Sequence, residues 1–163
     1  MSRESTPDII QTATVAIFSP DMRTIIVIVN ERLGMVLPPG WRHEEGKDNS
    51  IFATAIREVE EEIWLNLLQI PGNFLDQYWA ITLHQIVIHQ ENFIFSDNQK
   101  RGLNSLYFFR LADSIDESWL KAELSWLNYT RAQIVEESIR IGGREYVILD
   151  PTTKEFILRV MQD

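Results

Sequence analysis

Short apolar runs separated by polar turns make up the first forty residues. Residues 12–19 and 24–29 are rich in β-branched and small apolar side chains, and a Ser-Pro-Asp turn signal lies between them. Together the two runs predict a β-hairpin. Residues 35–37 form a third, shorter extended piece, which leads into a Pro-Pro-Gly sequence and a polar loop over 42–49.

A helical period replaces this pattern over residues 50–65. Apolar side chains recur there three and four residues apart, at Phe52, Ala55, Ile56, Val59 and Ile63. Polar side chains at 48–50 offer oxygens that can cap the start of a helix. At about 100° per residue the apolar positions share one face, whereas Glu58, Glu61 and Glu62 share another. We therefore predict a helix that packs on a core and carries three neighbouring carboxylates on the far side from that core.

The second half of the chain also predicts strands and a helix. Residues 79–90 and 103–111 are typical of long strands, with a polar segment at 96–102 between them. Residues 139–149 predict a hairpin turned by two glycines, which adopt positive φ easily. An Asp-Pro pair then starts a last helix that reaches Met161. No repeat or linker divides the chain, so we predict one mixed α/β domain over 1–163, with residues 1–10 as a polar lead-in.

Composition narrows the class of protein. The 163 residues are 45% hydrophobic and include no cysteine, which excludes a disulfide framework, a thiolate metal site and a cysteine nucleophile. The 24 acidic and 15 basic residues give a net charge of -9, which argues against a nucleic-acid partner because binding to polyanions depends on lysine and arginine. A divalent metal held by carboxylates would instead attract a small anionic substrate.

No apolar stretch has the length of a membrane span, and the first residues lack the apolar segment of a secretory signal. We therefore expect a cytoplasmic protein with no membrane partner. The long predicted strands and the five tryptophans would allow an apolar interface, so a homodimer stays open.

The acidic face of the 50–65 helix is the main candidate for chemistry. Clustered carboxylates repel one another unless a cation lies among them, and oxygen-rich clusters suit Mg²⁺ or Mn²⁺. The alternative is an acidic surface that meets only solvent or a protein partner. The context favours a site, because a strand, a polar loop containing Glu44-Glu45-Gly46 and this helix form one unit. Such a unit brings loop backbone close to the helix carboxylates, where it can help to grip a phosphate.

This segment resembles the signature of the Nudix hydrolase family, G-x5-E-x7-R-E-U-x-E-E-x-G-U, in which U is a bulky aliphatic residue. The R-E-U-x-E-E core is intact from Arg57 to Glu62. Upstream, Pro39-Gly40 and Glu44-Glu45-Gly46 are similar to the P-G-G and E-x-G elements of the family. The resemblance implies an α/β/α sandwich with a mixed central sheet over most of the chain.

The resemblance also implies roles for particular residues. Glu58, Glu61 and Glu62 would bind Mg²⁺ or Mn²⁺, and Arg57 would orient a carboxylate through a charge-assisted hydrogen bond. Arg57, Glu61 and Glu62 are thus expected to be catalytic. The implied reaction is metal-assisted attack of water on a phosphoanhydride in a nucleoside diphosphate linked to another moiety. The sequence does not indicate which nucleotide is the substrate or which carboxylate is the general base.

Residues outside the helix complete the implied site. Gly40, whose carbonyl is a further candidate ligand, and Glu44 are expected on the substrate side. Arg32 would contact a phosphate or sugar there, or else lie in a solvated turn. Glu123, just before a Leu-Ser-Trp sequence, is the candidate for an additional catalytic acid from a later loop, and Glu117 is its competitor.

Aromatic side chains are candidates for stacking on a base. These are Tyr78, Trp79 and Tyr107, and the alternative for each is packing in the core.

The loop and the end of the helix depart from the family pattern. The loop matches only with two extra residues, Lys47 stands where the motif has a glutamate, and Asp48 is a substitute for it. Trp41 replaces the second glycine of P-G-G. Trp64 replaces the late glycine and must find room over the core or toward a partner subunit. These departures support an alternative, a Nudix-fold nucleotide-binding or regulatory module with little turnover, whereas the intact carboxylates favour the enzyme.

Overall fold

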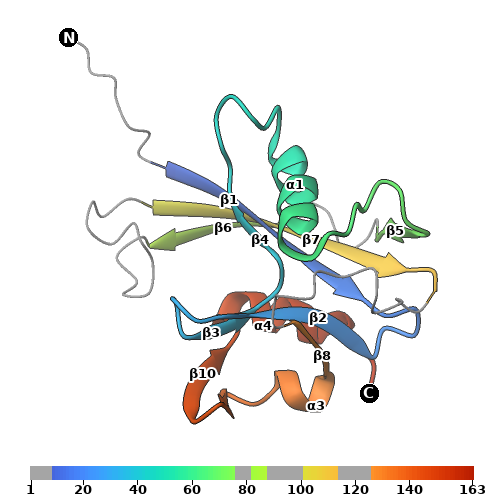
Figure 1. Cartoon of the computed structure of the whole chain (residues 1–163), viewed down its shortest axis with the longest axis vertical. Helices are drawn as coiled ribbons and strands as arrows, with labels where there is room; N and C mark the ends of the chain where they lie inside the picture. Colours follow the sequence, from blue (N-terminus) through green and yellow to red (C-terminus); the bar gives the residue numbers. More distant parts are fainter. Residues whose placement is uncertain (1–8, 76–81, 88–100, 114–125) are drawn as a thin grey trace.

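The computed structural model describes residues 9–75, 82–87, 101–113 and 126–163 (Figure 1). Its strands are β1 (Ile9–Phe18), β2 (Thr24–Asn30), β3 (Met35–Leu37), β4 (Gly40–Arg42), β5 (Gly72–Phe74), β6 (Thr82–Val87), β7 (Arg101–Leu111), β8 (Trp126–Thr130), β9 (Ser138–Ile141) and β10 (Arg144–Ile148). Its helices are α1 (Ile51–Ile63), α3 (Arg131–Ile134) and α4 (Pro151–Val160). Among these residues no helix is long and apolar enough to cross a membrane.

The strands form one mixed sheet with the order β5-β7-β1-β2-β3-β10-β9, and β4, β6 and β8 pair with β1, β7 and β2. β1 and β7 run parallel from Ile9 opposite Arg101 to Phe18 opposite Arg110. β1 pairs with β2 only at the turn, where Phe18 lies opposite Ile25. Beyond that point β4 lies beside β1, while β2 continues between β3 and β8.

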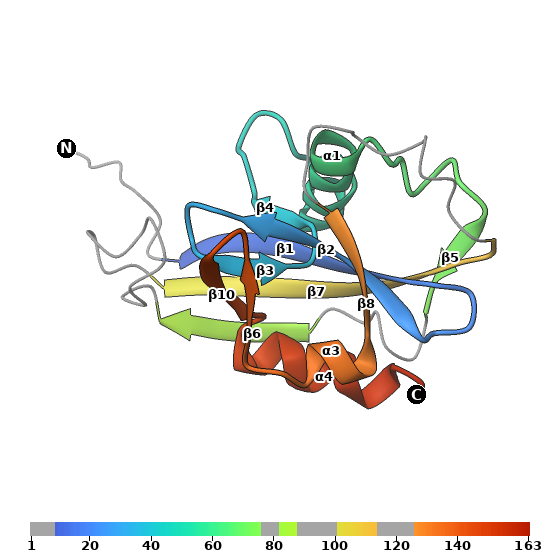
Figure 2. The same ribbon diagram turned by 60° about the horizontal axis from the view of Figure 1, so that its bottom comes forward.

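The helices cover opposite faces of the sheet, as Figure 2 shows, because the central strands bury side chains on both faces. One core joins Ile134 of α3 and Ile157 of α4 to alternate residues of these strands, including Ala16, Phe18, Val27 and Phe108. The other joins Val59 of α1 to the intervening strand residues, including Val15, Ile17, Ile26 and Tyr107. The expected α/β/α sandwich around a mixed sheet is confirmed.

Local signals place both long helices. The Ser50 side chain accepts a hydrogen bond from the backbone N–H of Ala53 at the start of α1. Asp150 caps α4 in the same way, with a proline in its first turn. The predicted glycine hairpin is also present, with Gly142 and Gly143 at φ values of 58° and 82°.

Several predicted boundaries differ from the structure. β1 begins at Ile9, so the polar lead-in assigned to residues 1–10 is two residues too long, because Ile9 and Ile10 pair with β7. Residues 40–42 form β4 against β1, although only a turn and loop were predicted there. Of the strand predicted at 79–90, residues 82–87 form β6 and the rest lie outside the described residues.

Candidate active site

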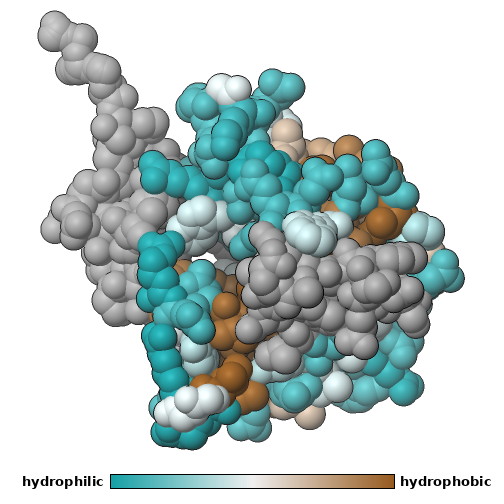
Figure 3. Space-filling model, in the orientation of Figure 1, coloured by the Kyte–Doolittle hydropathy of each residue, from teal (hydrophilic) through white to brown (hydrophobic). Residues whose placement is uncertain are grey.

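A cavity of about 440 Å³ lies between α1 and the segment that runs from β2 to β4. Its lining residues are Ile28, Val29, Asn30, Glu31, Arg32, Leu37, Pro38, Gly40, Trp41, Glu58 and Glu62. The volume falls in the range of small-molecule sites, and the walls combine carboxylates, aliphatic side chains, one arginine and one tryptophan. Figure 3, in the same orientation as Figure 1, shows hydrophilic residues gathered over the upper part of the molecule, where Figure 1 places α1 and the loop before it.

Gly40 holds β4 against the helix. Its backbone N–H donates a hydrogen bond of 2.7 Å to Glu62 Oε1. Gly40 has φ of 142°, and a Cβ atom there would lie 2.1 Å from the carbonyl oxygen of Ala13. Only glycine therefore allows this close approach of β4 to β1. The expected proximity of loop backbone and helix carboxylates is present at this bond.

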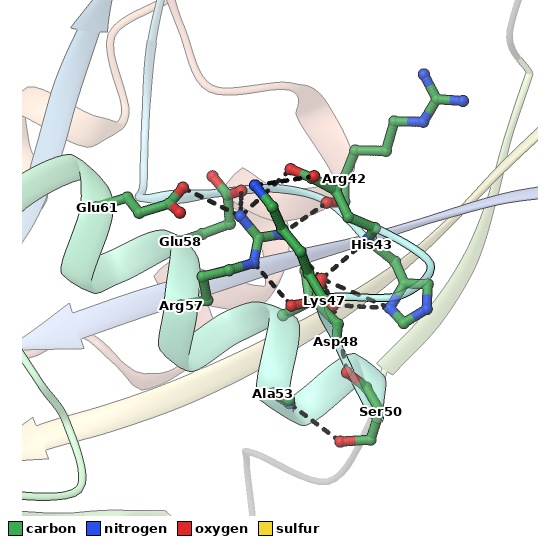
Figure 4. Close-up of polar contacts among 11 residues, drawn as sticks. Arg42, His43, Lys47, Asp48, Ser50, Ala53, Arg57, Glu58 and Glu61 are labelled. Carbon is green, nitrogen blue, oxygen red and sulfur yellow. Dashed lines mark hydrogen bonds and ion pairs between the residues drawn. The ribbon is translucent and has the colours of Figure 1, made fainter.

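Arg57, in the middle of α1, lies at the centre of an acidic cluster formed by this helix and the loop before it (Figure 4). Its Nε and Nη2 atoms donate to the two carboxylate oxygens of Asp48 at 2.7 and 2.8 Å. Its Nη1 atom donates to Glu58 at 2.8 Å and to Glu61 at 3.0 Å, and it lies 3.4 Å from Glu44. One guanidinium thus offsets the repulsion among four carboxylates.

Asp48 anchors the loop to the helix. Besides Arg57, its buried carboxylate accepts hydrogen bonds from the Glu44 backbone N–H and from the Thr54 hydroxyl, both at 2.9 Å. His43 Nδ1 lies 2.8 Å from the same hydroxyl, and it serves as the donor because that hydroxyl donates to Asp48. Hydrogen bonding from Arg57 holds the pKa of Asp48 well below its usual value although the group is buried.

The three carboxylates of the signature differ in their surroundings. Glu58 is buried, and burial raises its pKa even though Arg57 lies beside it. Glu58 and Glu62 line the cavity, whereas the Glu61 side chain is 54% exposed and turns to Arg57. The prediction that all three lie on the far side from the core is wrong for Glu58, because β4 packs on that side of the helix.

The fit to a metal ion depends on the chemistry of these donors. Within the described part of the chain, no three acidic or imidazole side chains stand close enough to hold an ion as they are. Arg57 lies between Glu58 and Glu61, and the Gly40 N–H bonds to Glu62. The donor set is nevertheless all oxygen, and a buried carboxylate with a raised pKa is stabilised by an added cation. These oxygen donors have the chemistry that Mg²⁺ and Mn²⁺ prefer.

The remaining residues named from the sequence are spread more widely. Arg32 is exposed at the cavity wall, and its guanidinium lies 5.9 Å from the ring centroid of Trp41. Glu44 does not line the cavity and instead pairs with Arg57 and with Lys47 at 3.3 Å. Glu123 and Glu117 lie outside the described residues.

The aromatic and helix-end predictions have mixed outcomes. Tyr107 is buried and packs against Phe52 and Phe74, so the core alternative holds for it. Tyr78 and Trp79 lie outside the described residues. Trp64 does not pack over the core but is 58% exposed, and it ends α1 in the left-handed region at φ 62°.

Two residues gain importance only from the structure. Asp48 was considered as a substitute for the motif's acid, but nothing in the sequence showed that it binds Arg57. Trp41 was noted only as a departure from the family pattern. Its place in the cavity wall depends on the pairing of β4 with β1, which three residues cannot signal by themselves.

Sequence comparisons find no matching family model and no matching curated protein. In structure the chain is similar to the Escherichia coli dihydroneopterin triphosphate pyrophosphohydrolase, with a TM-score of 0.63 and 13% identity over 91% of this chain and 92% of that one. A NUDIX-family hydrolase from Clostridium perfringens gives a TM-score of 0.59 and 12% identity over 92% and 94%. A MutT protein from Bacillus halodurans gives 0.55 and 16% over 91% and 79%. The chain therefore has the Nudix fold.

Proposed function

We propose that this chain is a metal-dependent pyrophosphohydrolase, which cleaves a phosphoanhydride bond in a nucleoside diphosphate linked to another moiety. The observation that supports this most is the cavity of about 440 Å³, into which the R-E-U-x-E-E helix contributes Glu58 and Glu62. Among the structures with the same fold are a protein named as a triphosphate pyrophosphohydrolase and one named as an Ap4A hydrolase.

Glu58 and Glu62 would hold Mg²⁺ or Mn²⁺, with Glu61 and the Gly40 carbonyl as further ligands. When bound, such an ion polarises a phosphoryl oxygen and lowers the pKa of a coordinated water. The ion would also offset the negative charge that substrate and protein share. Arg57 would keep Asp48 as its main partner through two hydrogen bonds.

The protein's own groups would position these ligands. The Gly40 N–H fixes one oxygen of Glu62, and Arg57, itself held by Asp48, orients Glu58. Arg32 is a cation in the cavity wall and would contact the nucleoside part of the substrate. Glu123 remains the proposed additional acid. The proposal includes a single catalytic domain over 1–163 in the cytoplasm, and gel filtration would test whether it forms a homodimer.

The experiment is a panel of nucleoside diphosphate derivatives incubated with Mg²⁺, with Mn²⁺ or with EDTA, with release of nucleotide and phosphate as the readout. Glu61→Gln and Glu62→Gln are compared with the wild type. Glu60→Gln is the matched control, because Glu60 is exposed on the same helix and does not line the cavity. We expect turnover that needs metal, falls strongly in the first two variants and persists in the control.

The other outcomes separate the alternatives. Binding of metal and nucleotide without turnover would favour the nucleotide-binding or regulatory module. Absence of metal binding in a folded protein would contradict the site itself.

A further inference from the structure

Trp41 faces the same side of the sheet as the acidic helix. In the antiparallel pair of β1 and β4, Trp41 lies directly opposite Ala13. Residues directly opposite each other project from the same face, and Ala13 is buried in the core beneath α1. The indole therefore lies on the α1 side, where it lines the cavity with Glu58 and Glu62.

Arg32 reaches Trp41 from a separate segment. It lies in the turn between β2 and β3, and its guanidinium is 5.9 Å from the indole centroid, within the range of a cation–π contact. Both residues line the cavity, and aliphatic side chains of Ile28 and Leu37 lie in the same wall. The cavity thus holds two flat groups beside an apolar surface, which is the composition of a site for a planar aromatic ligand.

The carboxylates are close to this aromatic group. Trp41 follows Gly40 in the strand, and the Gly40 N–H bonds to Glu62. The indole is therefore attached to the strand next to the residue that contacts this carboxylate. A single ligand in the cavity can therefore lie beside Glu62 and the indole at the same time. A glycine at position 41, as the family pattern has, would leave this part of the wall without a side chain.

We infer that Trp41 and Arg32 form a stacking platform for the base of the substrate, whose phosphates extend toward Glu58 and Glu62. The inference rests on the proposed function and adds the group that selects a nucleotide over simpler diphosphates. Every nucleobase presents a π face to an indole, so the platform favours nucleotides as a class. The alternative is a tryptophan that only covers β4, and its removal would then weaken all ligands alike.

The test uses two ligands that resist hydrolysis, α,β-methylene-ADP and methylenediphosphonate, titrated calorimetrically into the full chain in Mg²⁺ buffer. The first has a base and the second lacks one. We expect Trp41→Ala to weaken binding of the nucleotide analogue by about tenfold or more, as stacked bases show on alanine substitution, and to leave methylenediphosphonate unchanged. Trp41→Phe keeps an aromatic face and should stay within about threefold of the wild type.

Two further variants complete the design. Trp64→Ala is the matched control, since it removes an exposed indole outside the cavity and should change neither affinity. Arg32→Ala should weaken the nucleotide analogue and spare methylenediphosphonate. Unfolding curves of Trp41→Ala and Trp41→Phe show whether each variant is folded.

Opposite results would overturn the inference. If Trp41→Ala or Arg32→Ala weakened the binding of both ligands equally, that residue would only line the cavity or contact a phosphate, and it would not stack on the base. Unchanged nucleotide binding in Trp41→Ala, with binding lost in Glu62→Gln, would remove the platform and leave the proposed function intact. A wild type that binds neither ligand would contradict the proposed function and the platform together.

Discussion

Asp48 and Glu58 are two acids that share one guanidinium and respond to it differently. Asp48 receives two hydrogen bonds from Arg57 and two more from Thr54 and the Glu44 backbone, and its pKa is lowered. Glu58 receives one bond from Arg57, and burial raises its pKa. Burial raises the pKa of both carboxylates, but the four hydrogen bonds to Asp48 outweigh that effect and the single bond to Glu58 does not.

This difference divides the loop and the helix α1 into two regions. Around Asp48 the charges are matched within the protein, which suits a structural anchor between loop and helix. At the cavity, burial raises the pKa of Glu58, so the protein offsets its negative charge less completely than that of Asp48. A site for a cation needs such a surplus, so the position of Arg57 indicates which acids support the fold and which are available to a ligand.

The largest expected effect is on turnover. Glu58→Gln removes a cavity carboxylate, and we expect kcat to fall at least about a hundredfold, as losses of comparable electrostatic groups do. The free energy of unfolding should not fall, because the variant removes a buried charge with a raised pKa. Steady-state kinetics and urea unfolding at pH 7 measure the two effects. Full activity in this variant would contradict the view that Glu58 serves the reaction whereas Asp48 serves stability.

The main effect of Asp48→Asn should be on the stability of the fold. The substitution removes the negative charge that the guanidinium of Arg57, which is only 16% exposed, contacts through two hydrogen bonds. We expect the free energy of unfolding to fall by about 2 kcal/mol. Glu44→Gln is the control, because Glu44 also pairs with Arg57 but is 46% exposed and should cost less than about 0.5 kcal/mol. Similar losses of unfolding free energy in the two variants would show that Asp48 contributes no more to stability than the exposed Glu44.

The two acids should also respond oppositely to pH. The folded pKa of Asp48 lies below its unfolded value of about 3.9, so its stabilisation is present above that pH and is lost as the pH falls further. The folded pKa of Glu58 is raised, so its protonation on acidification relieves a cost of folding. The stability gap between wild type and Asp48→Asn should therefore shrink below about pH 4. Urea unfolding of both proteins between pH 7 and pH 3 measures this difference in stability. A difference that stays constant over this range would contradict the prediction.

The smallest effect concerns the far end of α1. Trp64 adopts φ of 62°, a conformation that glycine takes without strain. We expect Trp64→Gly to raise the free energy of unfolding by about 0.5 kcal/mol, because the relief of strain exceeds the added flexibility of the unfolded chain. Trp64→Ala keeps the strained φ and should bring no gain. Thermal unfolding of the two variants compares them directly.

Features with local signals could be predicted from the sequence. The period and caps of α1 and α4, the double glycine between β9 and β10 and the R-E-U-x-E-E segment all depend on residues within a few positions of one another. β4 could not be predicted, because three residues become a strand only through their pairing with β1. The bond between Asp48 and Arg57 depends in the same way on the path of the loop, in which Gly46 adopts φ of 86°.

The parallel pairing of β1 with β7 bears on the order in which the molecule folds. Among the described residues, those that line the cavity all lie between positions 28 and 62, whereas Ile9 pairs with Arg101. Closing so long a loop costs chain entropy before its contacts form, so this step is slow compared with the formation of the β1–β2 turn or of α1. A growing chain that has reached residue 63 already contains all these groups, yet one edge of its first strand stays open until β7 has been synthesised. The described groups that line the cavity are local in the sequence, whereas β7, the strand that pairs along the whole of β1, comes much later in the chain.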